Sequence, residues 1–286
     1  MSASEAGQAT HNAGLVTESS TTPAERRTLL ATCVMGAVRA AKVVREGAAR
    51  RSTLAWEQKG QSDYVSEVDR ASEAVLAEAI ATRHPDATLL AEEGSPDAQA
   101  SRGLVFVVDP LDGTTNFLHG VPWYAVSIAA LVDGIVVAGA VINVVTGDLC
   151  TATLGGGARL AGEPIRVSDT TDPARALIAT GFPFSRDDEI DRYVPMLPAI
   201  MRATAGMRRA GAAALDLADV ACGRYDAFFE LRLSPWDLAA GALLVREAGG
   251  IVTTLDGAPC PVAQTSILAG NPVMHSWLLK TVNGEP

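Results

Sequence analysis

The sequence of 286 residues predicts an α+β fold in which helices and sheets are stacked in layers. Three observations support this prediction. Helical periodicity dominates the chain up to Pro85, a block of apolar strands with a hairpin signal follows, and strands then alternate with helices to the end. Elements in this order are typical of domains built from packed layers of helix and sheet.

The N-terminal part of the chain predicts a tail followed by two helices. Residues 1–22 are polar, rich in Ser, Thr and Ala and without periodicity, so we expect a disordered tail. The first helix is expected to begin after Thr22, which can cap it, with Pro23 in its first turn. Apolar residues then recur at helical spacing, and a second helix is expected from Ser66 until just before Pro85.

The middle of the chain predicts a group of strands. They are expected at 88–91, 104–108, 124–132, 135–143, 148–153 and 159–167. The dipeptide Asp133-Gly134 separates the third from the fourth and favours a hairpin. Pro110 should end strand pairing because proline has no amide hydrogen. The small, polar segment 94–103 is expected to be a mobile loop, and the three glycines at 155–157 a turn.

The last part of the chain alternates between the two kinds of element. Strands are expected at 176–180, 226–230, 251–254 and 266–269, and helices at 189–203, 212–221, 236–247 and 272–282. The sequence contains no internal repeat and no low-complexity linker. We therefore expect a single domain at 23–286, which can be divided into sub-halves at 23–175 and 176–286.

The composition excludes several classes of protein. The formal net charge of −10 argues against a general nucleic-acid-binding protein, because phosphate backbones select basic surfaces. The four cysteines are scattered without zinc-site spacing, which favours free thiols in a reducing compartment. No signal segment is visible, and no apolar run reaches the ~18 residues of a membrane-spanning helix. We expect a cytoplasmic protein that requires neither nucleic acid nor a membrane.

The most informative motif is the run from Asp109 to Phe117, which reads Asp-Pro-Leu-Asp-Gly-Thr-Thr-Asn-Phe. Its two carboxylates leave the end of a strand, and Gly113 follows them where a glycine lets backbone amides approach a ligand. Carboxylate oxygens bind hard cations such as Mg²⁺, and clustered amides bind phosphate. The run therefore predicts metal-assisted phosphate chemistry.

Two further acidic residues can complete such a site. Glu92 follows the strand at 88–91, and Asp237 precedes an apolar run at the start of a helix. A carboxylate beside so apolar a run is costly to bury without an interaction partner. For Asp237 this partner is either a metal ion or the start of its own helix. The sequence leaves both roles open. Carboxylates on separate elements can hold two ions roughly 3.5–4 Å apart.

Other phosphate-binding and nucleophile motifs are absent from the sequence. It contains neither a Gly-x-x-x-x-Gly-Lys phosphate loop nor a Gly-x-Ser-x-Gly elbow. The spacing also differs from the Asp-x-Asp-x-Thr motif of haloacid-dehalogenase phosphatases, in which the first aspartate attacks phosphorus. With two residues between its aspartates, the run predicts that Asp109 is a metal ligand and not a nucleophile.

Four motifs together resemble the inositol monophosphatase family. The run 109–117 is similar to its first signature, and 236–241, extended to 250, is similar to its second. Segments 91–94 and 59–69 resemble its paired glutamates and its lysine-to-aspartate segment, so that the resemblance covers residues 25–282. It implies a layered αβαβα sandwich, often a homodimer, that hydrolyses small phosphate monoesters with Mg²⁺ and is inhibited by lithium.

The resemblance also implies roles for the matching residues. The ligands of two or three Mg²⁺ ions would be Glu92, Asp109, Asp112, Asp237 and the carbonyl of Leu111. Thr114, helped by Asp69 and Glu92, would orient the attacking water. The amides of Gly113, Thr114 and Thr115 would bind the phosphate. Direct, in-line attack by this water requires no covalent phosphoenzyme.

Substrate selection is implied to lie in the second half of the chain. Glu230 matches a glutamate that accepts hydrogen bonds from polyol hydroxyls, and such a buried acceptor discriminates because leaving it unpaired is costly. The segment 208–213 resembles Arg-x-x-Gly-Ser/Thr-Ala, so Arg208, Gly211 and Ala213 would line the substrate pocket. Ala212 stands where the family has a hydroxyl residue, which removes one hydrogen-bond partner.

The leading hypothesis is a Mg²⁺-dependent phosphatase that acts on myo-inositol 1-phosphate. Alternatives with the same site act on histidinol phosphate, fructose 1,6-bisphosphate or adenosine 3′,5′-bisphosphate, while the segment 115–117 together with Glu230 favours the inositol substrate. A regulatory interaction protein on the same fold is a further alternative. It predicts the decay of at least one ligand, whereas every expected ligand is present.

Overall fold

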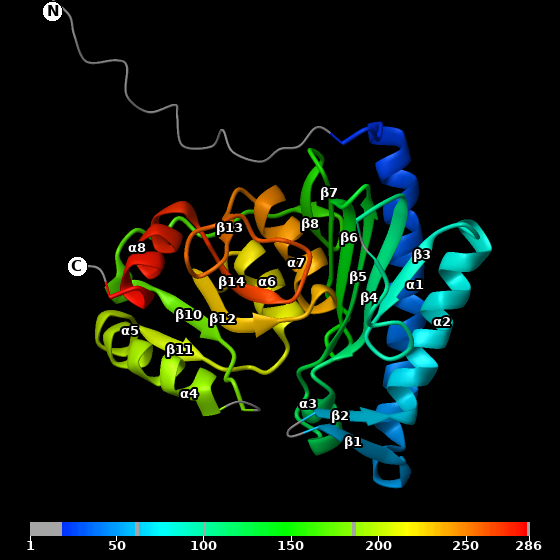
Figure 1. The fold of residues 1–286 in the computed structure, drawn as a ribbon, viewed down its shortest axis with the longest axis horizontal. Coiled ribbons are helices and arrows are strands. Elements are labelled where there is room, and N and C mark those ends of the chain that lie inside the picture. Colours follow the sequence, from blue (N-terminus) through cyan, green and yellow to red (C-terminus); the bar gives the residue numbers. More distant parts are fainter. Residues whose placement is uncertain (1–18, 61–62, 100, 185–186, 285–286) are drawn as a thin grey trace, which may run out of the picture.

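The computed structural model describes residues 19–60, 63–99, 101–184 and 187–284. The tail predicted at 1–22 therefore lies outside the described residues as far as residue 18. The described part stacks helices, a seven-stranded sheet, helices, a five-stranded sheet and helices (Figure 1). The predicted layered αβαβα sandwich is confirmed.

The first layer contains α1 (Pro23–Ala49) and α2 (Glu67–Arg83), which pack along each other and cover one face of the larger sheet. The start of α1 is as predicted. Thr22 Oγ1 accepts a hydrogen bond from the Glu25 amide at 3.3 Å, and Glu25 Oε2 accepts one from the Thr22 amide at 2.6 Å, so amides without helical partners are satisfied. Three short elements between the helices were not predicted: η1 (Arg51–Thr53), β1 (Trp56–Gly60) and β2 (Asp63–Ser66).

The larger sheet has the strand order β3-β4-β5-β6-β7-β8-β9. β3 runs parallel to β4, and the other neighbours are antiparallel. Its strands are β3 (Thr88–Ala91), β4 (Leu104–Asp112), β5 (Ala125–Val132), β6 (Ile135–Asn143), β7 (Leu149–Thr153), β8 (Gly157–Leu160) and β9 (Glu163–Pro164). Asp133 and Gly134 have φ of 50° and 80°, as the predicted hairpin turn requires.

Strand β4 does not end at Pro110. It continues to Asp112, so the prediction that the proline ends strand pairing is wrong. The register between β4 and β5 shifts between Asp109 and Asp112, and Pro110 lies in this irregularity, where its missing amide hydrogen is tolerated. The short helix α3 (Thr114–His119) follows directly. Both aspartates of the motif thus stay attached to the sheet.

The central layer consists of α6 (Ala213–Ala221) and α7 (Pro235–Glu247), which lie between the two sheets (Figure 1). Glycines allow the close packing. A Cβ on Gly241 would lie 2.6 Å from Leu217 Cβ, and one on Gly139 of β6 would lie 3.1 Å from Ala240 Cα. Helix α7 therefore fits tightly against both α6 and the larger sheet.

The smaller sheet and the outer helices form the last two layers. The sheet has the order β11-β10-β12-β14-β13, with strands β10 (Leu177–Thr180), β11 (Gly206–Arg208), β12 (Ala227–Leu233), β13 (Ile251–Thr253) and β14 (Thr265–Gly270). The outer elements are η2 (Pro173–Arg175), α4 (Asp187–Tyr193), η3 (Val194–Met196), α5 (Leu197–Ala203) and α8 (Pro272–Val282). The single helix predicted at 189–203 is thus divided, with Pro195 in η3 and Pro198 in the first turn of α5.

Candidate active site

A cavity of about 410 Å³ opens where β4 passes into α3. Most of the residues expected at the site line it. They are Glu92, Asp109, Leu111, Asp112, Gly113, Thr114, Thr115, Gly211 and Asp237. Three elements therefore supply the acidic side chains: the end of β3, the end of β4 and the start of α7. Folding brings together carboxylates that lie up to 145 positions apart, from Glu92 to Asp237 (237 − 92).

The end of β4 is held by hydrogen bonds on both sides. Asp109 Oδ1 accepts a hydrogen bond from the Leu111 amide at 2.9 Å, and the Ser72 hydroxyl of α2 donates one to the Pro110 carbonyl at 2.7 Å. Asp109 is 2% exposed and Asp112 is 8% exposed. Both carboxylates are therefore buried, and Asp109 is fixed by its hydrogen bond to the Leu111 amide.

Asp112 also caps helix α6 from outside that helix. Ala212 occupies the N-cap position of α6 and provides no side-chain hydrogen bond. Asp112 Oδ2 instead accepts a hydrogen bond from the Ala214 amide at 2.8 Å, and the amides of Ala213 and Leu215 also lower the Asp112 pKa. The expected metal ligand thus takes over the role of the missing cap.

Asp237 caps its own helix, and it also lies in the wall of the cavity. It is the third residue of α7, and its Oδ2 accepts a hydrogen bond from the Ser234 amide at 2.7 Å within a capping box. The same residue lines the cavity. Capping and a place in the cavity wall are therefore compatible in this fold.

Burial raises the pKa of three carboxylates of the cavity, and neighbouring carboxylates raise two of them further. Burial is the largest cause of the raised pKa of Asp109, followed by the charges of Glu92, Asp112 and Asp237. The pKa of Asp237 is raised by burial and then by Asp112 and Glu92. Burial raises the pKa of Asp112 to about 6, against the opposing effect of the α6 amides. Such a cluster of like charges is stabilised by bound cations.

The donor atoms of the cavity fit Mg²⁺. The expected ligands all offer oxygens, from four carboxylates and from the Leu111 carbonyl, and Mg²⁺ is a hard cation that prefers oxygen ligands. Within the described ranges, no three His, Cys, Asp or Glu side chains are already gathered in the arrangement of a metal site. The carboxylates line the wall of one cavity and would need to rotate towards a bound ion.

Thr114 and Asp69 form a buried pair beside these carboxylates. The Thr114 hydroxyl lies 2.9 Å from Asp69 Oδ1 and 3.0 Å from the Leu111 carbonyl oxygen. Asp69 is fully buried, and its second carboxylate oxygen accepts a hydrogen bond from the Ser66 amide at 2.9 Å. A hydroxyl that donates its proton to Asp69 can still accept a hydrogen bond from a water in the cavity.

The turn between β4 and α3 requires glycine. Gly113 has φ of 89°, in the left-handed region, and a Cβ there would lie 3.1 Å from the Trp123 carbonyl oxygen and 3.2 Å from that of Gly211. The Asn116 side-chain amide donates to the Trp123 and Ala210 carbonyls at 2.8 and 2.9 Å. These contacts fix the backbone of 113–115 against the segment that contains Gly211.

The structure places Arg209, and not the expected Arg208, in the wall of the cavity. The Arg208 guanidinium donates to the carbonyl of its neighbour Met207 at 2.9 Å. The Arg209 guanidinium lies 5.6 Å from the Phe182 ring centroid and 4.9 Å from that of Phe184. Its charge also lowers the pKa of Asp112. The family motif matches Arg208, and no motif indicated its neighbour Arg209.

Glu230 lies beside the cavity and not among the residues that line it. Burial raises its pKa to about 8, Arg209 lowers it and Asp112 raises it. A Cβ on Gly181 would fall 2.1 Å from the Glu230 carboxylate, so a larger residue there would displace this carboxylate from its present position. Ala213 contributes its amide to Asp112 and is likewise absent from the cavity wall.

Comparison with known proteins agrees with the motifs. The sequence model of the Inositol monophosphatase family matches residues 25–286. "Nus factor SuhB" of Pseudomonas aeruginosa is 45% identical over 237 residues, which cover 82% of this chain and 88% of that protein. "Phosphatase IMPL1, chloroplastic" of Arabidopsis thaliana is 40% identical over 260 residues, which cover 89% and 70%.

A solved structure provides the same relationship in three dimensions. The inositol monophosphatase from Anabaena (Nostoc) is similar with a TM-score of 0.81 and 35% sequence identity, over 92% of this chain and 98% of that one. The family match covers nearly all of the described residues, including each element that lines the cavity. The chain is therefore a member of the inositol monophosphatase family.

Proposed function

We propose that the chain hydrolyses a small phosphate monoester, myo-inositol 1-phosphate, with two or three Mg²⁺ ions. The observation that supports this most strongly is the meeting of Glu92, Asp109, Asp112 and Asp237 in one cavity beside the Thr114–Asp69 pair. Membership of the family and the phosphatase name of the Arabidopsis relative also support it.

Each part of the cavity has a role in this proposal. Mg²⁺ bound at the carboxylates and the Leu111 carbonyl supplies positive charge for the attacking water and for the phosphate oxygens. Thr114, which donates to Asp69, accepts a hydrogen bond from that water and so directs its lone pair towards phosphorus. Gly113, Thr114 and Thr115 line the cavity at the start of α3, and in this proposal their amides hold the phosphate.

Two residues of the second half are proposed to select the substrate. Glu230 accepts hydrogen bonds from the hydroxyl groups of the polyol, and Arg209 lies where it can contact the ester from the cavity wall. Ala212 is 1% exposed and is the N-cap of α6. The family has a hydroxyl residue at this position, and here Asp112 caps the helix instead. Histidinol phosphate, fructose 1,6-bisphosphate and adenosine 3′,5′-bisphosphate are the alternative substrates for the same site.

The test is phosphate release from a panel of these four esters, with Mg²⁺, with EDTA and with Li⁺. We expect the highest kcat/KM on inositol 1-phosphate, complete loss of activity in EDTA and inhibition by Li⁺. Asp109→Asn should lower kcat by about 10³-fold, because removing a charge from a metal site weakens the ion that stabilises the transition state. The matched control is Asp97→Asn at an exposed position outside the cavity wall. Activity that survives in EDTA or in Asp109→Asn contradicts the proposal.

We further propose that the protein is a cytoplasmic homodimer. The resemblance to the family supports the dimer, and among the described residues no helix is both long and apolar enough to cross a membrane. Sedimentation equilibrium measures the first of these expectations, and fractionation of the source cells measures the second.

The name of the Pseudomonas relative favours a second candidate function, that of a Nus factor. The acidic net charge favours a protein partner over a direct nucleic-acid contact for such a role. Complementation separates the two functions. If Asp109→Asn rescues cells that lack this chain, the cellular role does not require hydrolysis. If the variant does not rescue them while the exposed-site control does, hydrolysis is required.

A further inference from the structure

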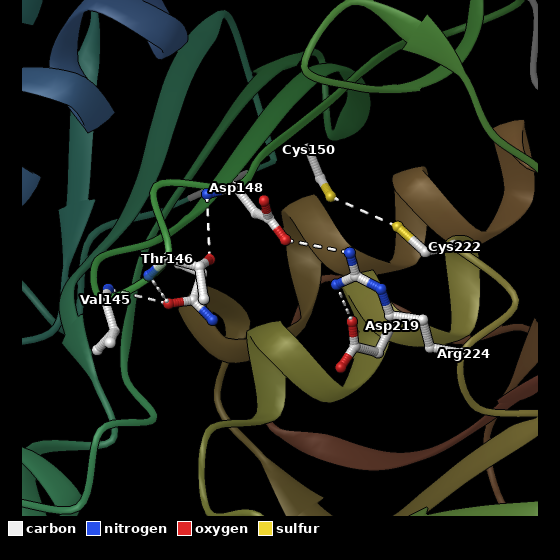
Figure 2. Close-up of polar contacts among 8 residues, drawn as sticks. Val145, Thr146, Asp148, Cys150, Asp219, Cys222 and Arg224 are labelled. Atoms are coloured by element: carbon white, nitrogen blue, oxygen red, sulfur yellow. Dashed lines mark hydrogen bonds and ion pairs between the residues drawn. The ribbon is translucent and has the colours of Figure 1, made fainter.

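Cys150 and Cys222 lie thiol to thiol on the side of the larger sheet that faces α6. Their Sγ atoms are 3.8 Å apart, and Figure 2 shows the two sulfurs pointing towards each other. Cys150 belongs to β7 and is buried, whereas Cys222 follows the last residue of α6 and is partly exposed. The other two cysteines do not face each other. Cys33 of α1 is fully buried, and the Cys260 thiol faces the Pro261 carbonyl.

A set of ion pairs braces the two elements that carry these thiols. The Arg224 guanidinium lies 2.8 Å from Asp219 Oδ1 of α6 and 3.1 Å from Asp148 Oδ2, just before β7 (Figure 2). Asp148 is two residues before Cys150, and Arg224 is two residues after Cys222. The same bridge that joins α6 to the sheet therefore holds the thiols opposite each other.

The turn that leads into β7 is also fixed. Asn143 Oδ1 accepts hydrogen bonds from the amides of Val145 and Thr146 at 2.9 and 3.0 Å (Figure 2). The Asn143 amide donates to the Asp148 carbonyl at 2.9 Å. The position of Cys150 is thus set by backbone contacts, and the distance between the thiols is not left to a mobile loop.

The two thiols are unequal in acidity. The hydrogen bond from Cys150 is the largest cause that lowers the pKa of Cys222, and the Arg224 charge lowers it further against burial and two nearby aspartates. The pKa of Cys150 is raised, first by the same hydrogen bond and then by burial. Because the thiolate is the reactive form, Cys222 is the nucleophile of the pair, and it is also the more exposed thiol.

We propose that Cys150 and Cys222 form a reversible disulfide when the protein reacts with hydrogen peroxide. The Cys222 thiolate attacks one peroxide oxygen, the O–O bond breaks, and the departing hydroxide takes up a proton to give water and a Cys222 sulfenic acid. Cys150 then attacks that sulfur as its own proton leaves, an S–S bond forms and the S–O bond breaks, with release of a second water. The two thiols lose two electrons, and the peroxide gains them.

The bond would connect the two sub-halves of the chain covalently. The sulfurs must approach by about 1.8 Å, from the present contact of 3.8 Å to a disulfide length of about 2.05 Å. The cross-link would tie β7 to the end of α6, whose first-turn amides hold Asp112. Because a cross-link restricts the unfolded chain, it should stabilise the folded protein against heat.

The experiment treats the full chain, without denaturant, with hydrogen peroxide and follows thiols and mass. When the treated protein is afterwards unfolded so that buried thiols can react, we expect the titratable thiols to fall from four to two, and the protein loses the mass of two hydrogen atoms. Peptide mapping should join Cys150 to Cys222, and dithiothreitol should restore all four thiols. Tm should rise by roughly 5 °C or more in the oxidised protein.

Variants separate this pair from general oxidation. Cys222→Ala should block the cross-link, and Cys150→Ala should leave a Cys222 sulfenic acid that dimedone traps. Cys260→Ala, which changes another partly exposed thiol, should cross-link like the original chain. A cross-link that persists in Cys222→Ala, a peptide map that joins other cysteines, or sulfenic acid without a cross-link in the unsubstituted chain overturns the proposal. None of these readouts depends on phosphatase activity, so they stand or fall independently of the proposed function.

Discussion

Thr114 holds the atom on which the proposed hydrolysis depends most directly. Its hydroxyl has one proton and two acceptors within 3.0 Å, the carboxylate of Asp69 and the carbonyl of Leu111. The buried Asp69 is itself fixed by the Ser66 amide. The hydroxyl oxygen is thereby oriented before substrate arrives, which is the condition under which a single hydrogen bond contributes most to catalysis.

We predict that Thr114→Val lowers kcat by about 10²- to 10³-fold and changes KM by less than about threefold, because only the water loses its orienting partner. Thr114→Ser retains the hydroxyl and should keep at least about a tenth of kcat. Steady-state kinetics on inositol 1-phosphate with saturating Mg²⁺ measure both. Equal losses in the two variants would indicate that the side-chain volume, and not the hydroxyl, matters at this position.

The adjacent arginines provide a matched pair for the substrate side of the cavity. Arg209 lines the cavity and lies over two aromatic rings, whereas the Arg208 side chain donates a hydrogen bond to the Met207 carbonyl. We predict that Arg209→Ala raises KM by about 10-fold or more, as expected for a lost charged contact, and that Arg208→Ala changes it by less than about twofold. The reverse order of effects would favour the position that the family motif suggests.

At the scale of elements, the junction between β4 and α6 shows how a residue proposed as a metal ligand can also stabilise the fold. A carboxylate close to the first amides of a helix both satisfies hydrogen-bond donors and interacts favourably with the helix dipole. Asp112 does this for α6, whose own N-cap is the alanine at 212. The same amides favour the ionised form of Asp112, which is the form that binds metal.

We predict that Asp112→Ala destabilises the metal-free protein by about 1–2 kcal/mol, the usual effect of a lost helix cap. Asp112→Asn keeps an acceptor for the Ala214 amide and should cost less than about 1 kcal/mol. Both variants should lose Mg²⁺-dependent activity because both lose the charge. Urea unfolding in EDTA gives the free energies of unfolding. Equal destabilisation by the two substitutions would exclude the capping role.

The elements differ in how far local sequence determines them. The start of α1 and the hairpin at Asp133-Gly134 follow from residues that act on their immediate neighbours, and both were predicted. The path of β4 through Pro110 depends on its pairing with β5. The helix predicted at 189–203 is interrupted at Pro195 and Pro198, which the prediction placed inside the helix. The hairpin β1–β2 consists of strands of five and four residues, too short for a clear periodicity.

The candidate site shows the same division at the scale of the whole molecule. The residues expected as ligands line one cavity, and they could be named in advance because motif residues carry chemistry that is visible in the sequence. Their role as ligands stays a prediction. Gly181 and Arg209 were not predicted. Gly181 is important only because the Glu230 carboxylate packs against it, and Arg209 is held by the aromatic rings that it contacts. Such contacts arise only when distant layers meet.

The charge of the whole cavity makes stability depend on pH in a definite direction. Burial raises the pKa of Asp112 from 3.8 to about 6 and that of Glu230 from 4.5 to about 8, and it raises the pKa of Asp109 and Asp237 as well. Between these limits the folded metal-free protein binds more protons than the unfolded chain. Its stability is therefore greatest below about pH 4 as far as these groups are concerned, and it falls as the pH rises through the folded pKa values.

We predict that in EDTA these acids lower the Tm as the pH rises from about 5 to about 8. Mg²⁺ should make this fall in Tm smaller, because it neutralises the ionised carboxylates. Glu230→Gln should flatten the upper part of the curve, since an amide does not ionise. Differential scanning calorimetry across this range, with EDTA and with Mg²⁺, measures all three effects, and Asp97→Asn again serves as the exposed control. If the metal-free Tm instead rises with pH, both in the unsubstituted chain and in Glu230→Gln, ionisation of the buried acids does not destabilise the folded protein. The main argument that the cavity binds cations would then be contradicted.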